Sequence, residues 1–162
     1  MEIIQPQPSD LIEIVYLQRV CFSELKSRRW LSCEIYKEFS IEDLKNIFIL
    51  KFNNLTLLGL IRINLSENAP DGQPNIKSLS SNPLYVDNII IHPNWWDKNA
   101  GGILIKFAED YARNNGYTSV RLNAYSENQV AIMLFEQSSF KRTGEFNSSR
   151  QKIPFLSFEK LL

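Results

Sequence analysis

The sequence predicts a single α/β domain over residues 1–162, and two observations carry that prediction. From residue 84 onward, apolar segments alternate between the two-residue period of a strand and the 3.6-residue period of a helix. In chain order these segments are strand, helix, strand, helix, strand, strand. The chain also has an ordinary length for one domain, and 44% of its residues are hydrophobic, which suffices for a core.

The first half of the chain is predicted to contribute a short strand, two helical regions and a hairpin. Ser9 and Asp10 form a cap for the first helix, and Asn53-Asn54 is the turn of the hairpin. The predicted ranges are a strand at 2–5, helices at 11–22 and 33–39, with extension of the second through 44 left open, and hairpin strands at 48–52 and 57–63.

Residues 65–83 show no period and are rich in Ser, Asn, Pro and Asp. A loop of this length inside a compact domain is usually a functional lid or a disordered segment. Both interpretations stay open at this stage.

The second half of the chain carries clearer signals. A helix beginning near Ile103 is predicted to end at Asn114-Asn115-Gly116, and Asn128 is predicted to cap a second helix with an apolar stripe of Ala131, Leu134 and Phe135. The remaining predicted strands are 119–125, 140–146 and 153–158.

The segment between residues 86 and 104 combines a strand with a ligand-binding type of turn. An apolar strand ends at His92-Pro93, and small residues then lead into a helix. Unpaired N–H groups in the first turn of that helix can hold a diphosphate without any basic side chain. The alternative is that the glycines serve turn geometry alone.

These residues carry a family resemblance. The segment IIIHPNWWDKNAGGIL resembles the acyl-CoA-binding segment of the GNAT superfamily of N-acetyltransferases. Downstream, VRLNAYSENQVAIMLFEQSSFKRTGEF resembles that family's strand, helix and strand, and KIPFLSFEKLL resembles the ending of many small bacterial members. The similarity spans about residues 84–162, whereas the N-terminal half fits only loosely.

The resemblance implies an α/β (α+β) fold with a mixed, mostly antiparallel central sheet. The family's sheet has about seven strands with a splayed central pair, flanked by about four helices. It also implies acetyl-CoA as co-substrate, with pantetheine beside the main chain of the splayed strand. The cofactor-binding residues so implied are Ile89, Ile90, Ile91, Asp97, Lys98, Asn99, Ala100, Gly101, Gly102, Asn128 and Phe135.

Several positions depart from the family pattern. Trp96 replaces a Gln or Arg, and Asn99 and Ser139 each replace a Gly. Asn is the best non-glycine residue for left-handed backbone, so the phosphate loop is weakened but kept. Phe135 replaces a Tyr that is often the acid for the departing CoA sulfur, and Asn123 lies where some members have a catalytic Glu.

Asp87 is the preferred candidate for the general base. A carboxylate within the apolar run 84–91 is costly to bury unless it is paired, solvated or used, and Tyr85 shares its face of the strand. The alternative is that Asp87 lies in a wet cleft at the splay and transfers no proton. In that case ordered water removes the proton.

Composition excludes several other classes of function. The formal net charge is zero with interspersed signs, which argues against nucleic acid and anionic membrane partners. Without an apolar leader or membrane-length segment, a cytoplasmic location is expected. Cys21 and Cys33 lack metal-binding spacing and His92 is the sole histidine, so no metal is expected. A homodimer is one assembly that the sequence leaves open.

Three functions therefore remain. The first is transfer of an acetyl group to the primary amine of a small molecule or peptide, and the second is a catalytically weakened CoA-binding regulatory protein. The third, a domain without CoA, conflicts with the breadth of the C-terminal match. For the acceptor amine, the implied fold suggests a wall formed by Glu24, Arg28, Arg29 and Trp30.

Overall fold

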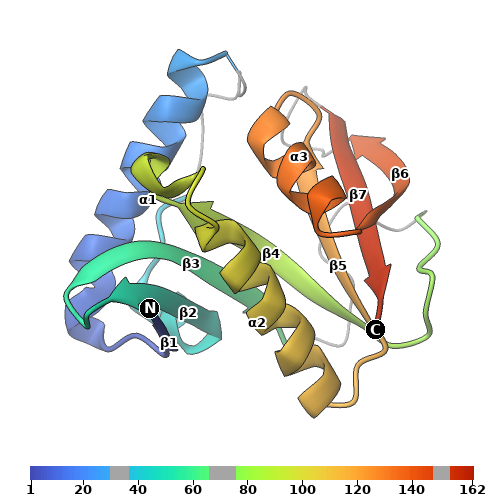
Figure 1. Cartoon of the computed structure of the whole chain (residues 1–162), viewed down its shortest axis with the longest axis horizontal. Helices are drawn as coiled ribbons and strands as arrows, with labels where there is room; N and C mark the ends of the chain where they lie inside the picture. Colours follow the sequence, from blue (N-terminus) through green and yellow to red (C-terminus); the bar gives the residue numbers. More distant parts are fainter. Residues whose placement is uncertain (30–36, 66–75, 148–153) are drawn as a thin grey trace.

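The centre of the molecule is an open mixed β-sheet of seven strands in the order β1-β2-β3-β4-β5-β7-β6. The computed structural model describes residues 1–29, 37–65, 76–147 and 154–162, and Figure 1 shows its elements. The strands are β1 (Glu2–Ile4), β2 (Ile47–Phe52), β3 (Thr56–Asn64), β4 (Pro83–Ile91), β5 (Ser119–Tyr125), β6 (Lys141–Asn147) and β7 (Pro154–Leu161). The helices are α1 (Leu11–Ser27), α2 (Ala100–Asn114) and α3 (Gln129–Gln137), with short 3₁₀-helices η1 (Pro8–Asp10), η2 (Ile41–Asn46) and η3 (Pro93–Trp95).

The sheet has one parallel pair, β4 with β5, and this pair separates along its length. Pairing runs only from Pro83 opposite Ser119 to Val86 opposite Leu122. Beyond Val86 the two strands diverge, as Figure 1 shows, and β5 continues against β7 alone. The other neighbouring strands pair antiparallel. The predicted mixed sheet with a splayed central pair is therefore confirmed.

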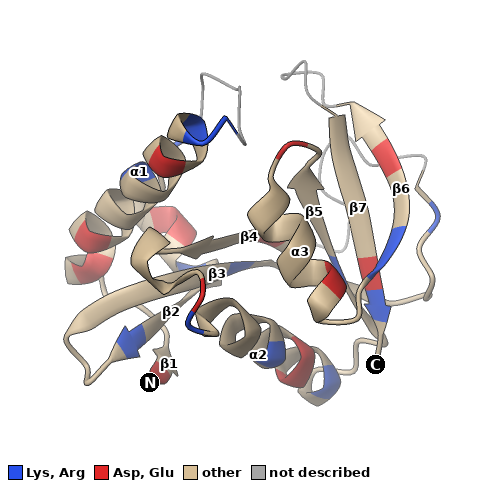
Figure 2. Ribbon diagram, turned by 45° about the horizontal axis from the view of Figure 1, so that its top comes forward, with Lys and Arg blue, Asp and Glu red and all other residues tan. Residues whose placement is uncertain are grey.

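Helices cover both faces of the sheet. Ile14 and Leu17 of α1 pack with Ile49 and Leu60 on one face, whereas Leu104 of α2 belongs to a second apolar cluster on the opposite face. Figure 2 shows α1 and α2 on opposite sides of β3 and β4. Alternate residues of a strand point to opposite faces, so each strand supplies both clusters.

Most predicted elements form where the sequence placed them. Both asparagines of the β2–β3 turn adopt left-handed backbone, with φ of 50° at Asn53 and 59° at Asn54. Helix α2 ends at Asn114, and Gly116 has a φ of 78°, the conformation that commonly follows a helix C-terminus. Strand β5 has the predicted bounds.

Two helix predictions need correction. Helix α1 continues to Ser27, beyond the predicted end near residue 22. The predicted helix at 33–39 lies largely outside the described residues, and its described part, 37–39, is not helical. The extension toward residue 44 is the 3₁₀-helix η2, whose start is capped reciprocally by Ser40 and Asp43.

Candidate active site

Strand β4 presents unpaired main-chain groups to the splay. The His92 N–H donates to the Leu58 carbonyl at 2.9 Å, and these residues continue the β3–β4 register. Antiparallel pairs alternate between bonded and non-bonded, so Ile90 exchanges hydrogen bonds with Leu60 of β3. The main-chain groups of Ile89 and Ile91 therefore point away from β3, toward the side that β5 has left.

The two outward residues differ in what already contacts them. The Ile91 carbonyl accepts a hydrogen bond from Trp96 Nε1 at 2.8 Å, and the Ile91 backbone also hydrogen-bonds the Cys21 thiol. In the described residues, no strand pairs with the outward groups of Ile89. Of the three isoleucines named from the sequence, Ile89 is thus best placed to pair with an extended ligand, while Ile90 is committed to the sheet.

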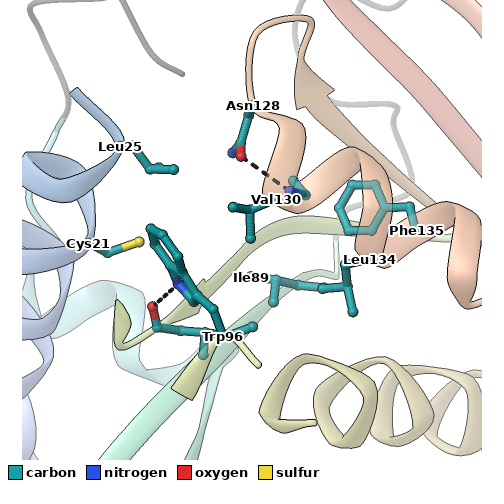
Figure 3. Close-up of a pocket in the computed structure, with 10 residues that line it drawn as sticks. Cys21, Leu25, Ile89, Trp96, Asn128, Val130, Leu134 and Phe135 are labelled. Atoms are coloured by element: carbon teal, nitrogen blue, oxygen red, sulfur yellow. Dashed lines mark hydrogen bonds between the residues drawn. The ribbon is translucent and has the colours of Figure 1, made fainter. Parts of the chain in front are cut away.

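A pocket lies directly over this half of β4. Figure 3 shows α1 on one side of it and α3 on the other, with the Trp96 indole between them. The lining is mostly apolar and comes from four segments of the chain. Its residues are Cys21, Leu25, Ile89, Ile91, Trp96, Asn128, Val130, Ala131, Leu134 and Phe135.

Two predicted cofactor contacts, Asn128 and Phe135, line this pocket from α3. The Asn128 side-chain oxygen accepts from the Ala131 N–H at 3.2 Å, so its predicted role as a helix cap is confirmed. Phe135 is 3% exposed and packs edge-on against Phe158, with ring centroids 5.5 Å apart. An aromatic ring at this position belongs to the core as well as to the pocket.

The start of α2 has the conformation expected of a phosphate loop. Asn99 adopts left-handed backbone with a φ of 59°, and its carbonyl accepts from the Ile103 N–H at 3.1 Å. The N–H groups of Ala100, Gly101 and Gly102 belong to the first turn, where a helix has no internal acceptors for them. Lys98 lies beside this turn with its ammonium 4.8 Å from the centre of the Trp95 ring.

The two glycines of α2 have different roles. A Cβ atom on Gly101 would lie 2.7 Å from Leu134 of α3 and 2.9 Å from Ile91 of β4. On Gly102 it would meet only the flexible end of the Asn99 side chain. Gly101 therefore permits close packing of three elements. Its predicted role in cofactor binding stays a prediction.

Asp87, the predicted base, lies in a β-bulge. Val86 opposes Ile63 and Asn88 opposes Arg62, so Asp87 has no partner on β3. Its side chain is 23% exposed, and Oδ2 lies 3.8 Å from Nε of Arg62. Burial raises the pKa of Asp87, while the Arg62 charge and a hydrogen bond with Asn64 act in the opposite direction.

Sequence reasoning missed a polar network on the face of the sheet opposite α2. Arg121 is 2% exposed and donates from Nε to Ser157 Oγ at 3.1 Å and from Nη1 to the Ile76 carbonyl at 3.0 Å. Glu159 is fully buried and accepts from Ser78, Leu79 and Ser119. The available signal was an alternating strand with Arg121 and Asn123 at every second position.

The described end of the 65–83 loop is attached to this network. The Ser78 hydroxyl donates to Glu159 at 2.6 Å and the Leu79 N–H donates to it at 2.8 Å. These bonds hold residues 76–80 against β5 and β7. Residues 66–75, the centre of the predicted loop, lie outside the described residues.

The predicted acceptor wall lies near the α1 side of the pocket. Glu24 and Arg28 form an ion pair at 2.7 Å, and the Arg28 guanidinium lies 5.1 Å from the centre of the Trp96 ring. Trp96 itself lines the pocket, so this part of α1 borders the predicted CoA side. Arg29 has left-handed backbone, and Trp30 lies outside the described residues.

Two further observations concern other classes of site. Burial raises the pKa of the Cys21 thiol to about 11, so it is un-ionised at neutral pH and unreactive. Within the described ranges, no three His, Cys, Asp or Glu side chains gather as metal ligands would, and none of the helices is long and apolar enough to span a membrane. Cys33 lies outside those ranges.

Comparisons with known proteins agree with this geometry. The sequence profile of the Acetyltransferase (GNAT) family matches residues 11–140. A curated relative, the uncharacterized N-acetyltransferase YhfO of Bacillus subtilis, is 25% identical over 114 residues, covering 70% of each chain.

Solved structures share the fold at low sequence identity. A GNAT-family acetyltransferase from Listeria monocytogenes has a TM-score of 0.72 and 16% identity, covering 99% of this chain and 94% of that chain. The PaiA N-acetyltransferase of Thermoplasma acidophilum, solved in complex with coenzyme A, has a TM-score of 0.67 and 16% identity, covering 99% and 98%. Together with the family profile, which spans most of the sequence, these findings show that the chain belongs to the GNAT family of acetyltransferases.

Proposed function

We propose that this protein transfers an acetyl group from acetyl-CoA to the primary amine of a small molecule or peptide. The observation that carries the proposal is the outward main chain of Ile89, which lies beside a pocket between α1 and α3. An extended amide-bearing ligand such as pantetheine can pair with that strand as a neighbouring strand would.

The start of α2 is suited to the diphosphate end of the same ligand, CoA. First-turn N–H groups and the helix dipole favour a diphosphate, and Asn99 to Gly102 form that turn. Lys98 and Asp97 lie just before it, and Lys98 adds a positive charge. The Asn128 amide nitrogen is left for a pantetheine contact, because the side-chain oxygen already caps α3.

The chemistry of acetyl transfer has three requirements. The amine has to be neutral to attack, the oxyanion needs a donor, and the thiolate has to leave. Asp87, alone or through water, accepts the amine proton, and the raised pKa of its carboxyl suits a base. An outward main-chain N–H of β4, such as that of Ile89, is the oxyanion donor. Phe135 supplies no proton, so the thiolate leaves unprotonated or takes a proton from water.

A second function is favoured by a specific set of side chains. Phe135 lacks a hydroxyl, Asn123 cannot act as a base, and Trp96 bonds the Ile91 carbonyl that a ligand would also use. A CoA-binding regulatory protein that has lost its chemistry would show these three features. Both functions predict CoA binding, but only the acetyltransferase is expected to turn over acetyl-CoA with an amine.

The deciding experiment is a panel of amines incubated with acetyl-CoA and scored by release of free thiol. Acetyl transfer predicts release above the no-amine control for at least one amine, together with thermal stabilisation by CoA. At a hundredfold excess over the dissociation constant, binding adds about 2.7 kcal/mol of stability. Stabilisation without release across the panel would favour the regulatory protein, and absence of both would contradict both functions.

A further inference from the structure

Buried polar atoms without hydrogen-bond partners lie on one face of the sheet. In the described part of the chain there are three such side-chain atoms: Arg62 Nε, Arg121 Nη2 and Asn123 Oδ1. They come from neighbouring regions of β3 and β5, on either side of the splayed end of β4. Buried polar groups are nearly always hydrogen-bonded, and of the two arginine atoms only Arg62 Nε has a carboxylate within 4 Å among the described residues, that of Asp87.

Arg121 is the most unusual of the three. Its partners are neutral: the Ser157 hydroxyl, the Ile76 carbonyl and the Tyr85 ring, whose centre is 5.9 Å from the guanidinium carbon. Glu159 lies opposite Arg121 on β7, but its oxygens accept from Ser78, Leu79 and Ser119. Arg121 is 2% exposed and its Nη2 has no hydrogen-bond partner among the described residues, which is costly unless a ligand completes its hydrogen bonds.

The position of the guanidinium links it to the splay. Arg121 bonds Ser157, which lies opposite Asn123 in the β5–β7 register, so the side chain reaches along β5 toward Asn123. Asn123 lies just beyond Leu122, the last β5 residue that pairs with β4. Arg121 and Asn123 therefore lie at the end of the stretch in which β5 pairs with β4, and their buried side chains share one face of β5.

We propose that Arg121 binds a carboxylate of the acceptor, so that the substrate is an amine that also carries a carboxylate, such as an amino acid. The proposal rests on the proposed acetyl transfer for the reaction, but its binding claim is independent of turnover. Arg121 Nη2 donates to the carboxylate, and Asn123 Oδ1 accepts from the amine. Asp87, on β4, supplies a negative charge that attracts an amine. Charge-assisted hydrogen bonds of this kind are roughly twice as strong as neutral ones.

The test measures binding to the CoA-saturated protein with matched probes. The probes are the common α-amino acids and the unbranched amino acids from glycine to 6-aminohexanoate, each paired with its carboxamide. The carboxamide keeps the size and the amine but removes the negative charge. Titration calorimetry gives the affinity of both members of each pair, and thiol release from acetyl-CoA is measured in parallel.

The expected result is that at least one amino acid binds about tenfold or more tightly than its carboxamide. Arg121→Gln should abolish that preference and leave carboxamide binding unchanged. Asn123→Asp places a carboxylate beside the guanidinium and should also abolish that preference, which keeps the test valid if Arg121→Gln does not fold. Arg113→Gln, which removes a positive charge from the exposed surface of α2, should retain the preference.

Equal binding of both members in every pair, or no binding of any pair, would overturn the proposal. So would a preference that survives both Arg121→Gln and Asn123→Asp. A carboxylate preference without thiol release would uphold the proposed site while contradicting acetyl transfer. Thiol release with equal use of amino acids and carboxamides would uphold acetyl transfer and contradict the proposed site.

Discussion

The pocket beside the splay and the polar face of the sheet offer a ligand different chemical groups. Between α1 and α3, the pocket is mostly apolar and offers main-chain groups of β4, with few polar side chains. On the face of the sheet opposite α2, the strands carry the polar side chains of Arg62, Asp87, Arg121 and Asn123. We infer that a ligand with amide groups suits the pocket and a charged acceptor suits the polar face.

This difference explains why only the main-chain part of the site can be recognised as a motif in the sequence. Recognition by main chain requires small residues and helix starts at fixed spacing, so the 99–102 segment stands out in one contiguous stretch. Recognition by side chains requires only that distant residues meet on one face. Arg62 and Arg121 are far apart in sequence and belong to no contiguous pattern.

The largest expected effect comes from Asp87→Asn on the polar side. If Asp87 is the base, kcat should fall by about 10²- to 10⁴-fold, the usual contribution of a positioned acid or base. Steady-state thiol release across a pH range measures the loss. A decrease below about threefold would mean that Asp87 transfers no proton.

The same variant should change stability in the opposite direction. Because burial raises the pKa of Asp87 in the folded state, the carboxyl favours folding when protonated and loses that contribution as pH rises through the folded pKa. Asp87→Asn should therefore be more stable than wild type at neutral pH, and the gap should close in acid. Denaturant unfolding at pH 4 and pH 7 tests the sign.

The next effect separates the two glycines on the apolar side. Gly101→Val forces a side chain into Leu134 and Ile91 and should cost about 1–3 kcal/mol in unfolding free energy, as overpacking does. Gly102→Ala is the matched control, because only the Asn99 side chain has to move. Chemical denaturation of both variants compares their unfolding free energies. Equal stability of the two would show that Gly101 is not a packing residue.

A smaller effect is expected for Phe135→Tyr. If departure of sulfur limits catalysis, a phenol in the pocket should raise kcat by up to about tenfold. Phe135 is 3% exposed, so thermal unfolding has to confirm that the added hydroxyl finds a partner. An unchanged kcat with an intact fold would mean that the leaving group does not limit the rate.

The smallest expected effect is a change in stability at Ser139, a backbone position that lines neither the pocket nor the polar face. Ser139 has a φ of 66°, a conformation that glycine adopts without strain. Ser139→Gly should therefore stabilise the protein by up to about 1 kcal/mol, whereas Ser138→Gly, at a φ of −86°, should not. Thermal midpoints of the two variants compare them. Stabilisation by Ser138→Gly alone would contradict the strain argument.

Much of the fold could be predicted because periodicity and turn residues act locally. Gly116 and the two asparagines after β2 mark chain reversals by their own backbone preferences, and Asn128 caps its helix through a bond within three residues. The splay itself came only from family resemblance. Local sequence does not specify where two parallel strands stop pairing.

Other features of the site depend on contacts between distant segments. Nothing in the sequence distinguishes Ile89 from Ile90, because the difference arises from the β3–β4 register. The packing role of Gly101 depends on Leu134, which lies on another helix. The surroundings of the buried Arg121 come from distant segments, because its side chain bonds the Ile76 carbonyl and Ser157 of β7.

Amide hydrogen exchange at Ile89 and Ile90 tests the central claim most directly, because adjacent residues serve as probe and control. The claim is that the outward main chain of β4 pairs with the pantetheine of CoA. Exchange is measured by NMR in the free and the CoA-saturated protein. We predict strong slowing of the Ile89 amide on CoA binding and little change at Ile90, whose N–H already bonds β3. An unchanged Ile89 amide in the CoA-saturated protein would contradict the account.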